Sequence, residues 1–285
     1  MAKKVGIVGC GLMGAGIVEV CIKSGHDTVV REVNEEFLSR GLARLDGSME
    51  RAVKRGKMTD AERETARARL TATTDLSALS ECDVIVEAIT EDRELKGKLW
   101  QDISKHARKD ALLATNTSSI PLSSLAPHTG NPTRFMGLHF MNPVPVMKLV
   151  ELVQGIESTE ETIAEGRAFV EGLGKTTILA KDTPGFVINV LLVPYLCDAV
   201  RLLEAGVATK EDIDEGMKLG CGMPMGPITL LDFVGLDTTL AISEVLHGEF
   251  GDPKYAAPPL LRRMVESGFM GKKCGRGFYD YGGGK

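Results

Sequence analysis

Short apolar runs rich in β-branched residues alternate with longer amphipathic stretches along the first part of the chain. Such runs between turn signals are typical of buried strands, whereas apolar residues at spacings of three and four are typical of helices. Their alternation predicts βαβ units, and therefore a Rossmann-type, doubly wound α/β fold with a parallel sheet. The predicted strands are Val5–Val8, Thr28–Val30, Val84–Val86, Leu112–Thr115 and Phe135–Phe140.

A charged stretch separates the second and third of these strands. Asn34 has the character of a helix N-cap, and Asp60–Leu70 is highly charged and helical in pattern. Between them, apolar residues recur at helical spacing at Leu38, Leu42, Leu45, Met49 and Val53. We therefore predict an inserted helical pair at about residues 34–70, standing off the sheet with its charged face toward solvent or substrate.

The pattern changes at Asp182-Thr183-Pro184-Gly185, a cluster of turn and breaker residues. Beyond it the chain has helical patterns and no strand pattern. We expect a dinucleotide-binding domain at residues 1–183 and an all-helical domain for substrate binding and dimerisation at residues 184–285. Phe186–Leu203 is apolar on nearly every face, which predicts a helix buried all round, in a core or against another subunit.

Composition narrows the class of protein. The 285 residues are enough for two packed units, and the formal net charge of −5 gives no overall attraction to nucleic acid or to anionic membranes. The six cysteines form no CxxC pair, so neither a metal site nor a disulfide framework is expected. Lys3-Lys4 leads directly into the first strand without a signal sequence, and no apolar run is long enough to span a membrane. We expect a cytoplasmic enzyme.

A glycine-rich turn follows the first strand. Gly9-Cys10-Gly11-Leu12-Met13-Gly14 is a GxGxxG sequence that opens a helical run, and Glu32 ends the next strand 23 positions after Gly9. In this context Gly9, Gly11, Leu12, Met13 and Gly14 are expected to bind a dinucleotide pyrophosphate, with Glu32 on the adenosine ribose. The acidic residue favours NAD(H), and neighbouring Arg31 keeps NADP(H) open. The alternative is a glycine turn in an α/β sheet that binds nothing.

Two ionisable residues fall opposite each other about a turn. His139 lies near the end of one predicted strand and Glu151 lies in a second, Met147–Val153, with Pro145 midway between them. Antiparallel pairing about this turn would set the carboxylate beside the imidazole. Such a pair suits a general base whose ring is oriented by the carboxylate. The alternative is a surface ion pair across a hairpin.

Further polar candidates interrupt strand-like or apolar sequence. Asn116-Thr117-Ser118-Ser119 follows a strand at the sheet edge where ligands gather, but such residues also cap helices. Asn189 is the one strongly polar residue between Phe186 and Cys197. A buried amide needs hydrogen-bond partners, which here would be a ligand, a helix end or the backbone carbonyl left without a helical N–H partner because Pro194 has none.

At these residues the chain resembles the L-3-hydroxyacyl-CoA dehydrogenase family, and within it the short bacterial 3-hydroxybutyryl-CoA dehydrogenases. The resemblance covers essentially the whole length. Besides the GxGxxG turn, it rests on EAITED at Glu87–Asp92, NTSS at Asn116–Ser119, HFMNPVPVMKLVEL at His139–Leu152, DTPGFVINV at Asp182–Val190, PMGP at Pro224–Pro227 and GRGFYDY at Gly275–Tyr281.

The resemblance implies roles for particular residues. The family's catalytic pair would be His139 and Glu151, and Ser118 and Asn189 would hold the 3-oxygen of the substrate. Ala88, Glu91, Lys96 and Asn116 would lie near the nicotinamide half of the cofactor. The helical pair would contact coenzyme A through a basic cluster of Arg51, Lys54, Arg55 and Lys57, although such a face is more often simply solvated. The C-terminal helices would form a homodimer.

The implied activity is reversible, NAD(H)-dependent oxidation of an (S)-3-hydroxyacyl-CoA, with 3-hydroxybutyryl-CoA and acetoacetyl-CoA as the expected pair. Two residues depart from the family pattern: Glu32 stands where aspartate is usual, and Met141 replaces the second aromatic of HFFNP. The alternatives are a relative acting on a free hydroxy acid or a sugar acid such as gulonate, and an NAD-binding relative without catalysis.

Overall fold

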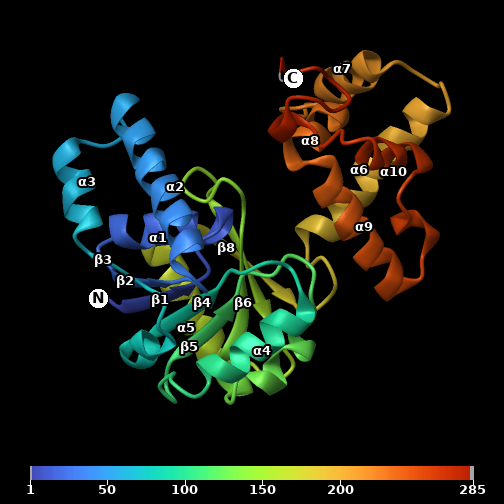
Figure 1. Ribbon diagram of the computed structural model, residues 1–285. Coiled ribbons are helices and arrows are strands. Elements are labelled where there is room, and N and C mark those ends of the chain that lie inside the picture. The colour runs from blue at the N-terminus through green and yellow to red at the C-terminus, as the bar shows by residue number, and fades with distance from the viewer. Residues whose placement is uncertain (1, 283–285) are drawn as a thin grey trace. The chain divides into compact units, whose positions relative to one another are not determined.

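The structure is a computed structural model that describes residues 2–282. The chain divides into two compact units, one ending at Thr183 and one beginning at Pro184 (Figure 1). Each unit has its own apolar core. Among the described residues, no helix is both long enough and apolar enough to cross a membrane.

The first unit is built on a sheet of eight strands in the order β3-β2-β1-β4-β5-β6-β7-β8. All neighbouring strands pair in parallel except β6 and β7, which are antiparallel. The predicted doubly wound α/β class is confirmed. The strands are β1 (Lys4–Val8), β2 (Asp27–Arg31), β3 (Leu70–Thr73), β4 (Val84–Glu87), β5 (Leu112–Thr115), β6 (Phe135–Phe140), β7 (Leu149–Gln154) and β8 (Thr176–Lys181).

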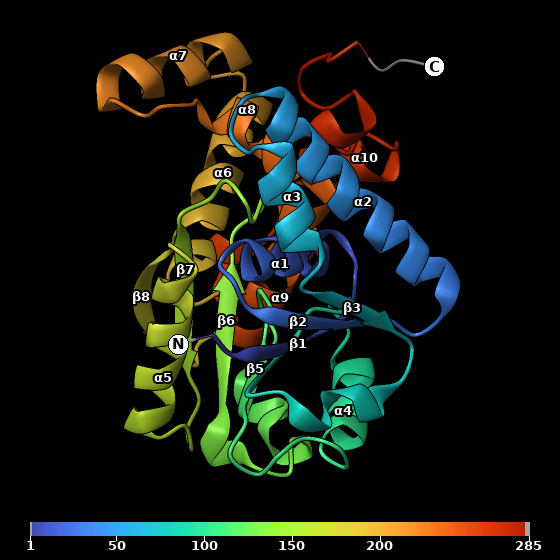
Figure 2. The same ribbon diagram turned by 90° about the vertical axis from the view of Figure 1, so that its left-hand side faces the viewer.

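Helices cover both faces of this sheet. They are α1 (Leu12–Lys23), α2 (Glu35–Lys54), α3 (Asp60–Arg67), α4 (Arg93–Ile103) and α5 (Glu160–Gly172). Helices α1 and α4 lie on opposite sides of β1 and β2 (Figure 2). Helices α2 and α3, in light blue in Figure 1, project away from the sheet as the predicted pair does.

Successive side chains along each strand point to opposite faces of the sheet. Val86, Ala114 and Phe140 point into the core shared with α1 and α5. Side chains one residue away along a strand point to the other face. On that face Phe135 of β6 packs against Trp100 of α4, with ring centroids 5.2 Å apart. Polar residues near the carboxyl ends of the strands therefore point to the α4 face.

Two boundaries in this unit differ from the sequence prediction by more than one residue. The helix predicted at Asp60–Leu70 ends at Arg67, and Leu70 begins β3, an edge strand that the sequence analysis missed. Its four residues have no apolar run and are partly exposed, so they resemble a loop. Strand β7 begins at Leu149 rather than Met147, because the Met147 N–H donates to the Pro143 carbonyl within the turn.

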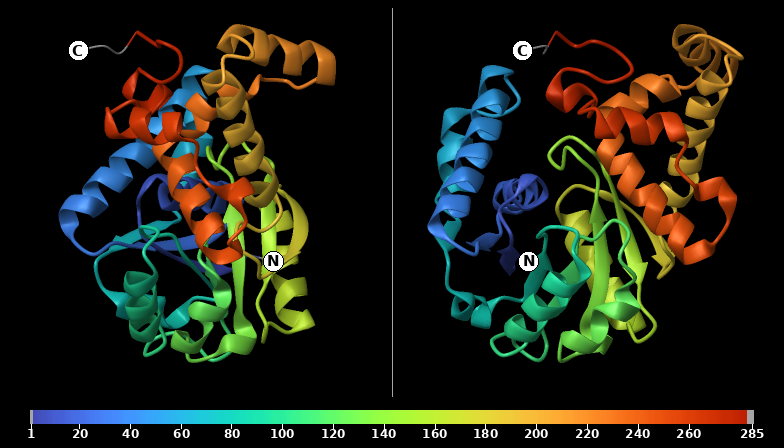
Figure 3. Two further views of the ribbon diagram at one scale, coloured as in Figure 1. Left: turned by 90° about the vertical axis from the view of Figure 1, so that its right-hand side faces the viewer. Right: turned by 45° about the vertical axis from the view of Figure 1, so that its right-hand side comes forward.

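The second unit is helical, as predicted, with two isolated bridges near its end. Figure 3 shows its helices in yellow to red. They are α6 (Ile188–Glu204), α7 (Lys210–Cys221), α8 (Pro227–Val234), α9 (Leu236–Phe250) and α10 (Pro259–Glu266). Within the single chain α6 is not buried all round, because Leu191 and Leu202 are 68% and 46% exposed, and burial against another subunit stays a prediction. Helix α6 also begins two residues later than predicted, after Phe186 at φ +50°.

Two buried aspartates hold the C-terminal motif of this unit. Asp232 accepts hydrogen bonds from the N–H groups of Phe278 and Tyr279, both at 2.9 Å, and from the Tyr281 hydroxyl at 3.1 Å. Asp214 accepts the Tyr279 hydroxyl at 3.0 Å. The GRGFYDY motif is thus part of the fold of the helical unit.

Candidate functional site

The glycine turn between β1 and α1 is shaped by close backbone contacts. Gly9 has φ +102°, and a Cβ on it would lie 2.7 Å from the carbonyl oxygen of Ala88. A Cβ on Gly14 would lie 1.9 Å from the Gly9 carbonyl oxygen, so only glycine fits there. A Cβ on Gly11, by contrast, would meet no atom of the described chain within 4 Å. Two of the glycines are needed by the fold, and the third leaves an open space.

This turn fits the pyrophosphate of a dinucleotide. Helix α1 begins at Leu12 after Gly11, which supplies no side-chain cap for its first N–H groups. Uncapped N–H groups and the positive end of the helix dipole form a ready site for an anion. The open space beside Gly11 lets such a group approach the backbone.

Glu32 lies directly beside this turn, at the end of β2. Its Oε2 accepts the Cys10 N–H at 2.8 Å, and its Oε1 accepts the Val33 N–H at 2.7 Å. The Arg31 guanidinium donates instead to the Thr74 carbonyl at 3.2 Å. The carboxylate therefore lies beside the glycine turn, and its contact with a ribose stays a prediction.

His139 and Glu151 are paired across β6 and β7, as predicted. His139 Nδ1 lies 2.7 Å from Glu151 Oε2. The alternative of a surface ion pair is wrong, because Glu151 is fully buried and His139 is only 7% exposed. With Nδ1 bonded to the carboxylate, Nε2 is the ring atom that can exchange a proton with a ligand.

The Asn116–Ser119 loop follows β5 at the same edge of the sheet. Asn116 Oδ1 accepts the Phe140 N–H at 2.9 Å, which ties the loop to the residue after His139. The segment does not cap a helix, because the next helical turn begins only at Leu122 and has Pro121 at its N-cap. The helix-cap alternative is therefore wrong.

Glu91 organises this loop. Its Oε1 accepts hydrogen bonds from the Thr117 hydroxyl at 2.6 Å, the Ser118 N–H at 2.7 Å and the Ser119 N–H at 3.0 Å. Burial alone would raise the pKa of Glu91, but the Lys96 ammonium and the hydrogen bonds from Thr117 and Ser118 outweigh it and lower the pKa. Glu91 is therefore a carboxylate at neutral pH.

Lys96 connects Glu91 to a residue that the sequence analysis gave no role. The Lys96 ammonium on α4 lies 2.6 Å from Glu87 Oε1 and 3.5 Å from Glu91 Oε2. Glu87 ends β4, and its side chain is fully buried, as is Lys96. In the sequence, Glu87 could have been noticed as a carboxylate at the carboxyl end of an apolar strand, inside the EAITED motif. Its pairing with Lys96, nine residues later, could not be predicted because it depends on how α4 folds against the strand.

The remaining predicted residues belong to other elements. Asn189 is in the second unit, in the first turn of α6, and is 8% exposed. The predicted coenzyme A residues are at the end of α2 and just beyond it, and all are exposed: Arg51, Lys54, Arg55 and Lys57.

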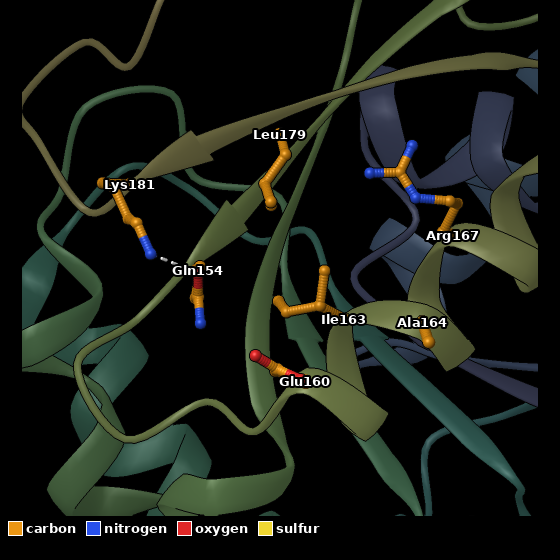
Figure 4. Close-up of a pocket in the computed structure, with 7 residues that line it drawn as sticks. All are labelled: Gln154, Glu160, Ile163, Ala164, Arg167, Leu179 and Lys181. Atoms are coloured by element: carbon orange, nitrogen blue, oxygen red, sulfur yellow. Dashed lines mark hydrogen bonds between the residues drawn. The ribbon is translucent and has the colours of Figure 1, made fainter.

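Two shallow hollows in the first unit contain none of the predicted residues. One, of about 300 Å³, lies beside β7, β8 and α5, where Lys181 Nζ donates to Gln154 Oε1 at 2.6 Å (Figure 4). The other, of about 510 Å³, lies between α2 and α3. The candidate site therefore rests on the geometry of the strand ends.

Comparison with known proteins places the chain in a family. Residues 4–183 match the model for the NAD-binding domain of 3-hydroxyacyl-CoA dehydrogenase, and residues 185–281 match the model for its C-terminal domain. The first unit is thus an NAD-binding domain.

Similar proteins agree over nearly the full length. The chain is 47% identical to a probable 3-hydroxybutyryl-CoA dehydrogenase of Deinococcus radiodurans, covering 98% of this chain and 100% of the relative. It is also 47% identical to a 3-hydroxybutyryl-CoA dehydrogenase of Mycobacterium tuberculosis, covering 98% of each. The crystal structure of (S)-3-hydroxybutyryl-CoA dehydrogenase from Ralstonia eutropha superimposes with a TM-score of 0.93 at 43% identity, covering 99% of each chain. Both domains and their order agree, and the chain belongs to the 3-hydroxyacyl-CoA dehydrogenase family.

Proposed function

We propose that this chain catalyses the reversible oxidation of an (S)-3-hydroxyacyl-CoA to the 3-ketoacyl-CoA with NAD(H). The observation that carries the proposal is the buried contact of 2.7 Å between His139 Nδ1 and Glu151 Oε2. It lies near the carboxyl end of β6, at the same sheet edge as the glycine turn. A hydride acceptor and a proton acceptor are the two components that alcohol oxidation needs.

His139 is the proposed general base in oxidation and general acid in reduction. In oxidation Nε2 takes the proton of the 3-hydroxyl group as the C3–H bond breaks, and in reduction it returns that proton to the carbonyl oxygen. Glu151 accepts the Nδ1–H and stabilises the imidazolium, a hydrogen bond to a charged group worth about 1.5–3 kcal/mol. The carboxylate also fixes the ring tautomer.

A nicotinamide cofactor, when bound, would supply the hydride acceptor for the C3–H bond. The N–H groups of Leu12, Met13 and Gly14 would hold the pyrophosphate, with Glu32 on the adenosine ribose. The residues proposed near the nicotinamide half are Ala88, Glu91, Lys96 and Asn116. A carboxylate at position 32 repels a 2′-phosphate, so we propose NAD(H) rather than NADP(H).

The substrate contacts complete the proposal. The hydroxyl of Ser118 and the amide of Asn189 would hold the 3-oxygen as it changes between alcohol and carbonyl. Guanidinium and ammonium groups bind phosphates well, which suits the exposed Arg51, Lys54, Arg55 and Lys57 to the phosphates of coenzyme A.

We further propose a homodimer formed by the helical unit. The exposed Leu191 and Leu202 on α6 are apolar surface that a partner subunit would cover. A cytoplasmic location stays a prediction from the sequence.

Turnover with a coenzyme A ester tests the proposal. NADH oxidation is followed by absorbance with acetoacetyl-CoA, with free acetoacetate, and with NADPH in place of NADH. We expect rapid turnover only with the ester and NADH. Turnover of free acids alone would favour the hydroxy-acid or sugar-acid alternative, and NADH binding without turnover of either would favour a non-catalytic relative.

A further inference from the structure

We propose that Glu87 is a positioning residue of this site, which sets Glu91 and the Ser118 loop through Lys96 and Thr115. The proposal rests on the proposed function for its catalytic consequence. Its structural consequence, the order of the loop, can be measured without turnover.

Glu87 is fully buried, and both of its oxygens accept hydrogen bonds. Oε1 accepts the Lys96 ammonium at 2.6 Å and the Ile89 N–H at 2.8 Å, and Oε2 accepts the Thr115 hydroxyl at 2.7 Å. A carboxylate is stable away from water only when it is paired and hydrogen-bonded, as Glu87 is. Its position is therefore tightly defined by the ends of β4, β5 and α4.

Lys96 is held by Glu87 and in turn holds Glu91. Besides the two carboxylates, its ammonium donates to the Ile89 carbonyl at 3.4 Å. The contact with Glu91 Oε2, at 3.5 Å, is an ion pair between a buried ammonium and a carboxylate. Lys96 is 1% exposed at its side chain, whereas Glu91 is 35% exposed. The ammonium thus transmits the position of a buried carboxylate to one that reaches the surface of the site.

The second route from Glu87 to the loop runs through Thr115. Its hydroxyl donates to Glu87 Oε2 and accepts the Thr117 N–H at 3.3 Å. The Thr117 hydroxyl then donates to Glu91. Glu87 therefore reaches the residues around Ser118 from both sides, from β5 through Thr115 and from α4 through Lys96 and Glu91.

The hydrogen bonds of Glu87 are not needed merely to hold β4 against β5. The backbone ladder already joins these strands from Val84↔Leu112 to Glu87↔Thr115, and an apolar side chain would fill the same buried volume without the cost of burying charges. The hydrogen bonds of Glu87 lead to the loop that carries Ser118. That connection is what an apolar residue could not provide.

The test is Glu87→Gln, with Glu94→Gln as the matched control. Both variants remove one negative charge, but Glu94 is exposed on α4, the helix that carries Lys96. Amide hydrogen exchange is measured in the folded protein at fixed pH. In Glu87→Gln we expect exchange at Ser118 and Ser119 to become about tenfold faster or more, while the amides of β4 and β5 change little, because only the loop loses its anchor. In Glu94→Gln no change is expected at either place.

Kinetics with acetoacetyl-CoA and NADH give the functional readout. We expect Glu87→Gln to lower kcat by about tenfold or more and to raise the KM of the ester, as for the loss of a charged hydrogen bond that orders the site. The Kd of NADH should change less than kcat, because the glycine turn proposed to bind the pyrophosphate follows β1 and, among the described residues, has no hydrogen bond to Glu87. Glu87→Asp, which keeps the carboxylate, should recover part of kcat.

The outcomes separate the two proposals. Loop exchange that is unchanged in Glu87→Gln would overturn the positioning role, whether or not the enzyme turns over. Faster loop exchange in a protein that never reduces acetoacetyl-CoA would support the positioning role and remove the proposed function. If Glu87→Gln does not fold, Thr115→Val serves as a second variant, because it keeps the ion pair of Glu87 with Lys96 and removes only the hydrogen bonds of the Thr115 hydroxyl. Normal exchange in the Ser118 loop of Thr115→Val, together with a normal kcat, would overturn the proposal.

Discussion

Gly11 and Gly14 offer a matched pair of substitutions that separates cofactor binding from folding. Gly11→Ala and Gly14→Ala add the same methyl group at positions three residues apart, one before α1 and one in its first turn. At Gly14 the new Cβ would lie 1.9 Å from the Gly9 carbonyl oxygen, whereas at Gly11 it would meet no atom of the described chain within 4 Å. The two variants should therefore differ in stability but both weaken NADH binding.

The magnitudes follow from these contacts. Accommodating the Gly14 methyl requires the turn and the start of α1 to separate by about 1 Å or more, and overpacking of this kind costs about 1–3 kcal/mol of unfolding free energy. Displaced N–H groups would lose hydrogen bonds to phosphate at about 1.5–3 kcal/mol each. Losing two of them would weaken NADH by about a hundredfold or more.

Gly11→Ala should behave differently when no cofactor is bound. Gly11 has φ −68°, which alanine adopts without strain, so a smaller entropy of the unfolded chain would stabilise the protein by about 0.4–1 kcal/mol. The methyl would nevertheless occupy the open space through which the pyrophosphate approaches, and NADH binding should fall.

Thermal unfolding and NADH fluorescence titration measure both effects. Without NADH, we expect the Tm of Gly14→Ala to fall by several degrees and that of Gly11→Ala to stay level or rise. Gly11→Ala that binds NADH as tightly as the unchanged protein would refute the assignment of the turn to the pyrophosphate.

Three further predictions concern the cofactor, the substrate and a thiol. Glu32→Ala should weaken NADH and relax discrimination against NADPH, and an unchanged ratio of the two Kd values would remove Glu32 from the ribose site. Replacing Arg51 and Arg55 together by alanine should raise the KM for acetoacetyl-CoA by about tenfold with little change in kcat, and an unchanged KM would show that this face is only solvated. Burial, with a contribution from the Glu32 carboxylate, raises the pKa of Cys10 to about 11. At pH 8 we therefore expect Cys10 to be alkylated far more slowly than exposed Cys274, as followed by mass spectrometry. Equal rates would contradict the packing of the turn.

The central strands could be predicted because buried strands consist mostly of apolar residues, which a short stretch of sequence shows. Strands β5 and β6 were predicted with the bounds that the structure has, since each is a short, mostly apolar run that is buried throughout. Strand β3 was missed because a parallel edge strand with exposed Thr71 needs no apolar pattern. Its hydrogen bonds come from β2, far away in the sequence.

Side-chain contacts within the candidate site could be predicted from the residues alone where a short turn relates the two partners. His139 and Glu151 face each other because the register of β6 and β7 is nearly symmetric about Pro145. No such local relation joins Glu87 to Thr115, 28 positions later, or Glu91 to Ser118. Those contacts depend on the packing of α4 against the sheet and on the order of β4 and β5, which a single sequence does not display.

The acid–base role of His139 can be tested with His139→Gln. Hydride transfer is measured in a single turnover of preformed enzyme–NADH mixed with acetoacetyl-CoA, and the Kd of NADH is measured in parallel. We expect a rate lower by several orders of magnitude, with NADH binding nearly unchanged because the glycine turn and Glu32 are intact. A rate within about tenfold of the unchanged protein would contradict this role.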